Sequence, residues 1–388
     1  MGKTATVCSL LFFMTLIQMS VDIYLPSTLV IANELHTSIA NVQLTFFAFL
    51  ITSGLSQLLY GPLMDRFGRK PCMVFGAMIF FATSIMAALT PSITLLIIAR
   101  TFQGIGAGVF SVGSRATMRD ILTHDEFKKT AIYQGMTWSL VPILAPVIGS
   151  YVQHYFGWRY NFGILAIAGL ISVLLTCKLT ESLKQRADNI HLWQILKSYG
   201  GVVSHAQFWP FMVGTVSDSI LLAAFYIFAP ILLQGNLGVS VIQYGWIMFY
   251  IALAALVAMA LNRIMINRVP DRYMMMTSLL LCIGSGIAII TGCILGTHLI
   301  GWFMAAMMMM QFGMSWLFPL CISYAMRPMQ LQAGKAAAVI GCGNLTSSGL
   351  ASLIIAYIVV RNEWIFGGLY VVVSIVLLLI FARFKWPK

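Results

Sequence analysis

Three charged residues, Asp22, Arg100 and Asp218, lie inside long apolar stretches of the sequence. An Asp or Arg at the centre of a bilayer costs about 2.5–3.5 kcal/mol on insertion scales, so such residues usually face a bundle interior and have a function or a partner. Burial disfavours the charged form of a carboxylate, and a nearby arginine favours it. A carboxylate in a cavity that opens alternately to each side can therefore take up a proton on one side and release it on the other.

The depths of these residues decide which of them can meet. Asp22 lies roughly 24 Å from the beginning of its span, and Arg100 lies roughly 10–12 Å from the beginning of a span that enters from the opposite face. Contact or water-bridged coupling is compatible with these depths, as is a structural ion pair that locks the two spans together. Asp218 is close to mid-membrane, and it is either bonded to Thr215 or Ser217 or forms a second proton or cation site.

The composition excludes a soluble globular protein. Of the 388 residues, 60% are hydrophobic and only 9% are charged, whereas soluble domains contain about 25% charged residues. The net charge of +12 does not indicate nucleic-acid binding, because the 23 Lys and Arg recur as short clusters between apolar runs. The sequence has no nucleophile–base arrangement, metal-ligand spacing or phosphate-binding glycine loop, so we expect neither an enzyme nor a cofactor or metal.

A helix needs roughly 20 predominantly apolar residues to cross the hydrocarbon core of a membrane. The gaps between charged residues predict an all-α integral membrane protein with twelve transmembrane helices. The predicted spans are 6–31, 41–63, 72–90, 93–115, 130–153, 160–178, 208–232, 239–261, 275–295, 299–322, 337–360 and 364–382.

The distribution of cations predicts the orientation of these spans. If the N-terminus is cytoplasmic, only Arg159 and Arg361 lie outside and Arg100 is buried, while all other Lys and Arg lie inside. We therefore expect a multi-pass protein with both termini in the cytoplasm.

The chain divides into two halves of six spans each. The predicted domains are residues 1–178 and 208–388, joined by a charged cytoplasmic linker, 179–207, that contains an interfacial helix. Asp22-Ile-Tyr-Leu-Pro26 in the first span aligns with Tyr226-Ile-Phe-Ala-Pro230 in the seventh. This pattern favours a two-bundle transporter whose site lies between the halves near mid-membrane.

The loop between the second and third spans carries a specific motif. Its sequence is Gly61-Pro-Leu-Met-Asp65-Arg66-Phe-Gly68-Arg69-Lys70. It resembles the Gly-x-Leu-x-Asp-Arg-x-Gly-Arg-Lys signature of the major facilitator superfamily at every defining position.

Three further segments extend this resemblance. Arg100-Thr-Phe-Gln103-Gly104 is similar to the second motif of the family, and Pro142-Ile-Leu-Ala-Pro146-Val-Ile-Gly149 resembles the Pro/Gly motif of its proton-driven exporters. Asp22-x-Tyr-Leu-Pro26 resembles the Bcr/CflA drug-resistance transporters, which belong to the drug:proton antiporter branch. The match covers the first six spans well, and the second half is matched mainly by hydropathy.

The resemblance implies two pseudo-symmetric six-helix bundles that alternate access and exchange protons for lipophilic drugs. It places the proton-coupling carboxylate at Asp22, with Arg100 nearby. For the motif between spans two and three it implies a conformational gate, in which Asp65 interacts with a helix end near Lys335 and Arg69 pairs with Asp120. The implied gate residues are Gly61, Asp65, Arg66, Gly68, Arg69, Lys70 and Asp120. Pro142, Pro146 and Gly149 form either the antiporter motif or a plain close-packing surface.

Helical spacing and the resemblance together suggest the substrate pocket. Gln18 and Leu25 share the face of Asp22, and Leu222 and Phe225 share the face of Asp218, with Tyr226 at its edge. The resemblance adds three residues: Phe46, Met136 and Trp138. We expect Asp22 itself to contact substrate as well.

The leading hypothesis is a proton-coupled exporter of lipophilic, often cationic small molecules in a bacterial inner membrane. The alternatives are a dedicated exporter of a metabolite such as an amino acid, sugar or siderophore, a proton-coupled importer, and a passive facilitator or sensor. The expected partners are a small-molecule substrate, protons and the lipid bilayer, without nucleic acid, and we expect a monomer.

Overall fold

The structure is a computed structural model that describes residues 1–183, 185, 192–265, 268–297, 299–359 and 364–384. Along these ranges every regular element is a helix, and twelve helical segments are long and apolar enough to cross a membrane. Helices satisfy their backbone hydrogen bonds internally, as a lipid environment requires. The predicted fold class and number of spans are therefore confirmed.

The first six spans contain α1 to α7. Their bounds are α1 Lys3–Asp22, η1 Leu25–Ser27, α2 Thr28–Glu34, α3 Ile39–Phe67, α4 Arg69–Ala88, α5 Ile93–Ile121, α6 His124–Tyr155 and α7 Arg159–Lys178. The first span is broken between α1 and η1, just before Pro26. Proline lacks a backbone N–H and disfavours helical backbone at the preceding residue, which explains the break.

Side chains fix several helix beginnings in this half. The Ser38 and Ser92 hydroxyls accept hydrogen bonds from backbone N–H groups in the first turns of α3 and α5. Thr123 and Glu126 form a capping box at the beginning of α6, which satisfies two otherwise unpaired N–H groups. The Lys3 ammonium, 2.6 Å from Glu126, and the bonds from Thr123 lower the pKa of the Glu126 carboxyl to about 2.

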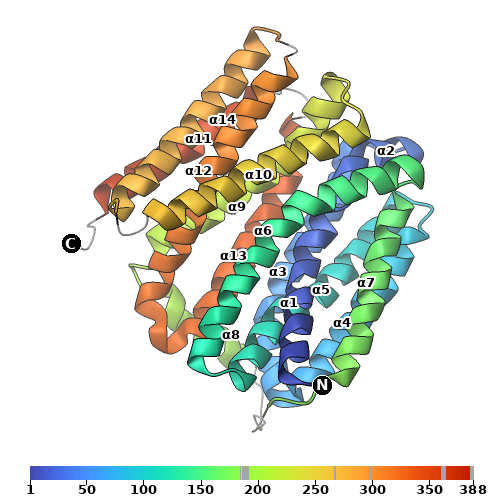
Figure 1. The fold of residues 1–388 in the computed structure, drawn as a ribbon, viewed down its shortest axis with the longest axis vertical. Coiled ribbons are helices and arrows are strands. Elements are labelled where there is room, and N and C mark those ends of the chain that lie inside the picture. The colour runs from blue at the N-terminus through green and yellow to red at the C-terminus, as the bar shows by residue number, and fades with distance from the viewer. Residues whose placement is uncertain (184, 186–191, 266–267, 298, 360–363, 385–388) are drawn as a thin grey trace.

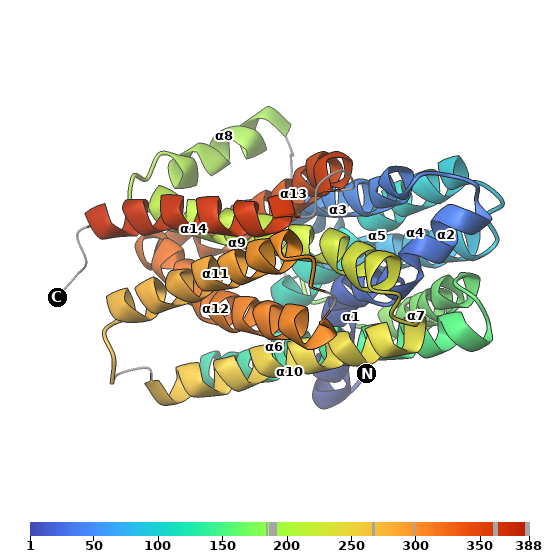
Figure 2. The same ribbon diagram turned by 90° about the horizontal axis from the view of Figure 1, so that it is seen from above.

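The last six spans follow α8 (Leu192–Val203). Their bounds are α9 Trp209–Pro230, η2 Ile231–Asn236, α10 Val241–Met265, α11 Asp271–Ile294, α12 Ile300–Met326, η3 Arg327–Gln332, α13 Ala333–Val359 and α14 Trp364–Arg383. The element η2, which follows Pro230 directly, is a π-helix that ends at Asn236. Figure 2 shows α8 outside the bundle, and the Tyr199 hydroxyl donates to the Leu58 carbonyl oxygen of α3 at 3.2 Å.

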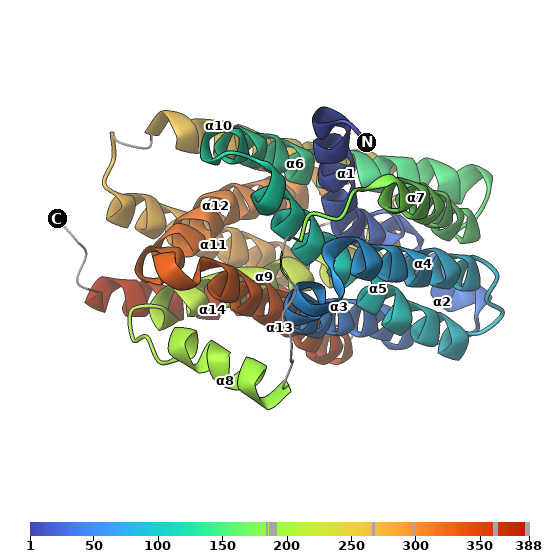
Figure 3. The ribbon, with the colours of Figure 1, turned by 90° about the horizontal axis from the view of Figure 1, so that it is seen from below.

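The helices of the two halves meet along two seams. Figure 1 shows α6 beside α10, and Figure 3 shows α13 beside α3. Small residues permit these approaches. A Cβ added to Gly245 of α10 would overlap the Ser150 side chain of α6, and one added to Gly54 of α3 would press on Thr346 of α13. The core is built in the same two parts, with one large hydrophobic cluster in the first half and two in the second.

Candidate functional site

A cavity of about 420 Å³ lies between the two halves. Its wall is mostly apolar and is built from α1, α3, α5, α6, α9, α10, α12 and α13. The polar and charged residues on the wall are Gln18, Gln43, Gln57, Ser111, Arg115, Asp218, Ser219, Tyr226, Gln311, Ser315, Asn344, Ser348 and Ser352.

Asp22 lies directly behind this wall. Its side chain is fully buried and does not line the cavity. The Gln18 amide, one turn earlier on α1, donates to both carboxylate oxygens at 2.9 Å and to the Tyr226 hydroxyl oxygen at 3.0 Å. The Tyr226 hydroxyl is also within hydrogen-bonding reach of the carboxylate. Since Gln18 and Tyr226 both line the cavity, Asp22 is separated from it by one layer of side chains.

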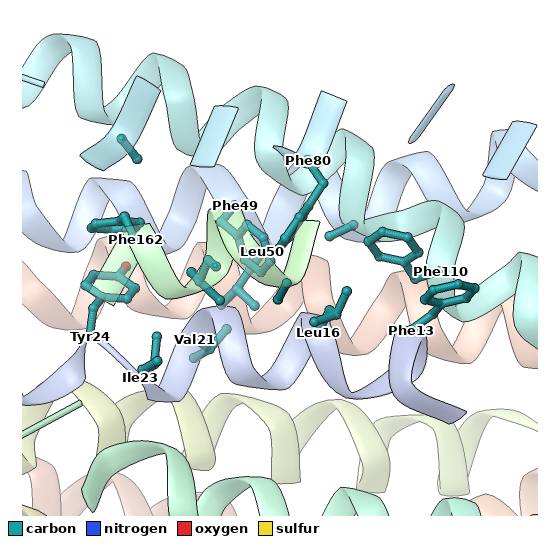
Figure 4. Close-up of a cluster of buried hydrophobic side chains, with 14 of the residues drawn as sticks. Phe13, Leu16, Val21, Ile23, Tyr24, Phe49, Leu50, Phe80, Phe110 and Phe162 are labelled. Atoms are coloured by element: carbon teal, nitrogen blue, oxygen red, sulfur yellow. The ribbon is translucent and has the colours of Figure 1, made fainter. Parts of the chain in front are cut away.

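Arg100 is completely buried in an aromatic enclosure. The guanidinium carbon is 4.1 Å from the centre of the Phe49 ring, 4.8 Å from that of Tyr24 and 5.9 Å from that of Phe162. Figure 4 shows the Tyr24 ring next to Phe162. The Arg100 Nη1 donates a hydrogen bond to the side-chain Oε1 of Gln103 at 2.6 Å. Cation–π attraction and this bond stabilise the charge.

The structure does not pair Arg100 with Asp22. In the part of the chain that it describes, neither side chain contacts the other, and no carboxylate forms an ion pair with Arg100. The physical reason is the break in the first span: α1 ends at Asp22, and Tyr24, just beyond it, packs on the guanidinium. The predicted Asp22–Arg100 coupling therefore has no direct contact in this conformation.

Asp218 lies on the cavity wall in α9. The residue is 6% exposed, and its Oδ1 has no hydrogen-bond partner among the residues that the structure describes. Thr215 does not provide one, because its hydroxyl donates to the Met212 carbonyl oxygen of its own helix. Asn344 of α13 also lines the cavity, and its Oδ1 is likewise buried without a described partner. Both oxygens are available to accept bonds from a ligand.

The predicted pocket residues divide into several groups. Gln18, Phe46, Leu222 and Tyr226 line the cavity. Leu25 and Phe225 do not: Leu25 is buried in η1, and Phe225 is buried in the second-half core. On α9 the lining residues include Ser219, Ala223 and Ile227. The lining face is therefore rotated away from the face centred on Asp218, so that Tyr226 rather than Phe225 points to the cavity.

On α6 the prediction also requires correction. Met136 is 54% exposed and is not part of the lining, whereas Gly135 and Pro142 are. These two are seven residues apart and therefore share a helix face that excludes Met136. The side chain of Trp138 lies outside the described residues.

The gate motif forms an ion cluster at the junction of α3 and α4. Arg69 Nη1 is 2.7 Å from Asp65 Oδ1, and Arg69 Nε is 3.2 Å from Asp120 Oδ2 at the end of α5. The implied Arg69–Asp120 pair is thus present. Among the described residues Asp65 bonds to Arg69 and has no bond to α13. Arg66 stacks on the neighbouring Phe67 ring, and Gly61 has no heavy atom within 4 Å of where a Cβ would be.

Glu181, just after α7, completes this cluster and was not predicted. It accepts hydrogen bonds from the backbone N–H groups of Arg69 at 3.0 Å and Lys70 at 3.2 Å, so it caps α4 from 112 positions away. Partial burial alone would raise the pKa of the Glu181 carboxyl, but these bonds and one from Leu183 lower it. Gly68 has a φ of +106° and no room for a Cβ against Glu181. The sequence offered one indication of this contact. The helix α4 begins directly after Gly68, which has no side chain to cap it, so the cap has to come from elsewhere in the chain.

The Pro/Gly motif of α6 lies where that helix crosses the break in the first span. A Cβ at Gly149 would overlap the carbonyl oxygen of Ile23, the residue that follows the end of α1. The Asn161 amide donates to the Gly149 carbonyl oxygen at 3.3 Å. Pro142 lines the cavity, and the Pro146 carbonyl oxygen faces Gly245 of α10. The motif therefore provides close packing at both the broken span and the seam between the halves.

Ten polar wall residues were not predicted, and five of them carry an amide or a cation: Gln43, Gln57, Arg115, Gln311 and Asn344. The sequence feature that could have identified them is an amide or a cation within an apolar span. Only the orientation of each helix, which depends on tertiary packing, distinguishes these residues from others that face the core.

The described ranges hold twelve apolar helices, eight of which enclose a cavity with ionisable groups on and behind its wall. This arrangement defines a membrane transporter of small molecules. The chain belongs to the Major Facilitator Superfamily, whose family model matches residues 8–327.

Several curated proteins are similar over most of their length. Multidrug resistance protein D of Escherichia coli (strain K12) is 30% identical over 341 residues, which cover 87% of this chain and 84% of that protein. A chloramphenicol resistance protein of Pseudomonas aeruginosa is 28% identical, with 93% of this chain and 86% of that protein covered. Multidrug resistance protein MdtL of Shewanella oneidensis is also 28% identical, with 93% and 88% covered.

Two solved structures share the fold. A D-xylose–proton symporter superposes with a TM-score of 0.70 at 16% identity, covering 96% of this chain and 95% of the other. A peptide transporter, POT, superposes with a TM-score of 0.76 at 14% identity, covering 97% and 94%. The family and these structures are transporters rather than enzymes, in agreement with the sequence-based expectation.

Proposed function

We propose that this chain exports a range of lipophilic, often cationic small molecules in exchange for protons. The names of its relatives, which are multidrug and chloramphenicol resistance proteins, support this assignment. The cavity supports it as well, because a mostly apolar wall with a few polar groups suits loose substrate selection. The alternative of a dedicated metabolite exporter would be expected to present a denser set of polar contacts for one compound.

The observation that carries the proton coupling is the position of Asp22. The carboxyl is buried, accepts hydrogen bonds from Gln18, has the Tyr226 hydroxyl within reach, and lies one layer behind the cavity. A cationic cargo beside Gln18 and Tyr226 would favour ionised Asp22 by Coulomb attraction. A proton on Asp22 would remove that attraction. Cargo and proton thus oppose one another in binding, which is the thermodynamic requirement for antiport.

The contacts between the halves support a conformation that receives cargo from the side of the termini. On the opposite side, the Gln234 amide donates to the Pro26 carbonyl oxygen at 3.1 Å, and Trp246 donates to the Tyr151 hydroxyl at 3.3 Å. The cavity extends from there towards Gln57 and Gly341 near the other ends of α3 and α13. In our proposal the termini are cytoplasmic, the membrane is a bacterial inner membrane, and one monomer containing both halves is the functional unit.

The test is accumulation of a fluorescent cationic dye in inside-out vesicles with an acidic interior. We expect Asp22→Asn to abolish accumulation, while Asp125→Asn, which removes an exposed carboxylate at the beginning of α6, leaves it unchanged. If the dye only equilibrates across the membrane, whether or not a proton gradient is imposed, the protein is a passive facilitator. Transport of a single metabolite without any dye would identify a dedicated exporter.

Asp218 is a second candidate proton site, supported by its unpartnered oxygen on the cavity wall. If it carries a proton, Asp218→Asn should lower the number of protons exchanged per dye while dye export continues. An unchanged stoichiometry would leave Asp218 as a cargo-binding group.

A further inference from the structure

A second arginine in α5 lies on the cavity wall. The Arg115 Nε donates to the Ser111 carbonyl oxygen at 3.2 Å, and its Nη2 donates to the Ser111 hydroxyl. Both partners are neutral and belong to the preceding turn of the same helix. Nη1 has no hydrogen bond to any residue that the structure describes, so one arm of the guanidinium is available to a ligand.

Arg115 also has no counter-ion among the residues that the structure describes. The ion pairs in the described part of the chain engage other arginines and lysines, namely Lys3, Arg69, Arg159 and Arg327. Arg100 likewise has no carboxylate partner among the described residues, but it is completely buried and enclosed by aromatic rings, whereas Arg115 is partly exposed and lines the cavity. A cation removed from bulk water without a partner is unfavourable, and an anion that enters the cavity would compensate it.

The packing register places Arg115 away from Asp218. Gly108 of α5 packs on Ser56 of α3, and Gln57 of α3 faces Gly341 of α13. Ser111, to which the guanidinium bonds, is therefore close to the level of Gly341. On the other side of α13, the Ser348 hydroxyl donates to the Ser219 carbonyl oxygen at 2.9 Å. The levels of Ser111 and Asp218 thus differ by roughly six residues along α13, which is an offset of about 9 Å in the direction of that helix.

We propose that Arg115, with Ser111 and Gln57 beside it, forms an anion subsite that binds the acidic group of zwitterionic cargo. The cationic group of such a cargo would lie towards Asp218 and Asn344, whose free oxygens accept hydrogen bonds. Guanidinium groups bind carboxylates through two parallel hydrogen bonds, which gives this subsite geometric selectivity. This inference rests on the proposed export function and extends its substrate class from lipophilic cations to amphoteric compounds.

The test compares norfloxacin, a fluorescent zwitterion, with its methyl ester, which keeps the amine and the aromatic core but lacks the carboxylate. Tetraphenylphosphonium is the purely cationic probe. Binding of all three to the full-length protein is measured in nanodiscs of zwitterionic lipid and of anionic lipid. The variants are Arg115→Gln, Arg115→Lys and Arg119→Gln, the last of which removes an exposed cation one turn further along α5.

We expect Arg115→Gln to weaken norfloxacin binding at least tenfold without changing binding of the ester or of tetraphenylphosphonium. Arg115→Lys should retain part of the affinity, and Arg119→Gln should retain all of it. An equal loss for the three probes would overturn the anion subsite and indicate a structural role. A second result would also overturn the anion subsite for cargo: weaker norfloxacin binding in anionic than in zwitterionic nanodiscs, with no such difference in Arg115→Gln. That result would mean that Arg115 binds a lipid headgroup. A wild-type protein that binds none of the probes would contradict the export function itself.

Discussion

The Gln18 amide of α1 donates to the Tyr226 hydroxyl oxygen of α9 at 3.0 Å, which links residues 208 positions apart across the two halves. The same amide holds the Asp22 carboxylate. One side chain therefore contacts the cavity, the buried acid and the opposite half, so a change at any of these three places alters the bonds available to the other two.

Removal of the Tyr226 hydroxyl should uncouple this arrangement. A hydrogen bond to a charged group contributes about 1.5–3 kcal/mol, so Tyr226→Phe should reduce gradient-driven dye accumulation by about tenfold or more. Tyr250→Phe, which changes an exposed tyrosine of α10, is the matched control. Full accumulation by Tyr226→Phe would mean that Gln18 alone supports Asp22.

A methyl group at Gly149 should destabilise the protein. It would overlap the Ile23 carbonyl oxygen, and overpacking of this kind costs about 1–3 kcal/mol. The thermal unfolding midpoint of Gly149→Ala in detergent should fall by several degrees. Gly163→Ala in α7, where nothing lies within 4 Å of the added methyl group, should leave the midpoint unchanged or raise it. Equal midpoints for the two variants would show that the break at Ile23 relaxes freely.

The contact between Gly68 and Glu181 predicts non-additive stability. Glu181→Ala removes the cap of α4, at a cost of about 0.5–2 kcal/mol. Gly68→Ala adds backbone strain at φ +106°, overlap with Glu181 and a tight contact with Pro71. In the Glu181→Ala background the overlap with Glu181 is absent, while the strain and the Pro71 contact remain. Gly68→Ala should therefore cost less stability in that background, as measured by unfolding midpoints of the four proteins. Strictly additive costs would contradict the overlap.

The Lys3–Glu126 pair should respond to acid. Because the folded-state pKa of Glu126, about 2, is below the ordinary value of 4.5, the pair is fully present above pH 4.5 and is lost as the pH falls through 2. A nitroxide label at a Thr4→Cys position should become mobile with a midpoint near pH 2. With Glu126→Gln the label should be mobile across this range. A wild-type midpoint near 4.5 would show that Lys3 does not stabilise the carboxylate.

The sequence alone was sufficient to predict the membrane spans and to single out the charged residues within them, because both predictions follow from the cost of placing a charge in lipid. Asp22 and Arg100 were recognised in this way, but their relationship was not. The sequence predicts similar depths for the two, but the break before Pro26 brings Tyr24, rather than Asp22, against the arginine. Likewise, helical periodicity placed Phe225 on the cavity face, whereas tertiary packing rotates α9 so that Tyr226 occupies it. Glu181 was beyond prediction, because no local pattern connects it with a helix that begins 112 residues earlier.

Because Asp22 is set one layer back from the cavity, our proposal assigns proton exchange to a residue that does not line the surface on which compounds would bind. Substitutions such as those at Phe46, Leu222 or Asn344 can then reshape the range of exported compounds without disabling energy conversion. Under antibiotic pressure, such a protein can acquire resistance to a new drug by single steps, each of which leaves a working pump.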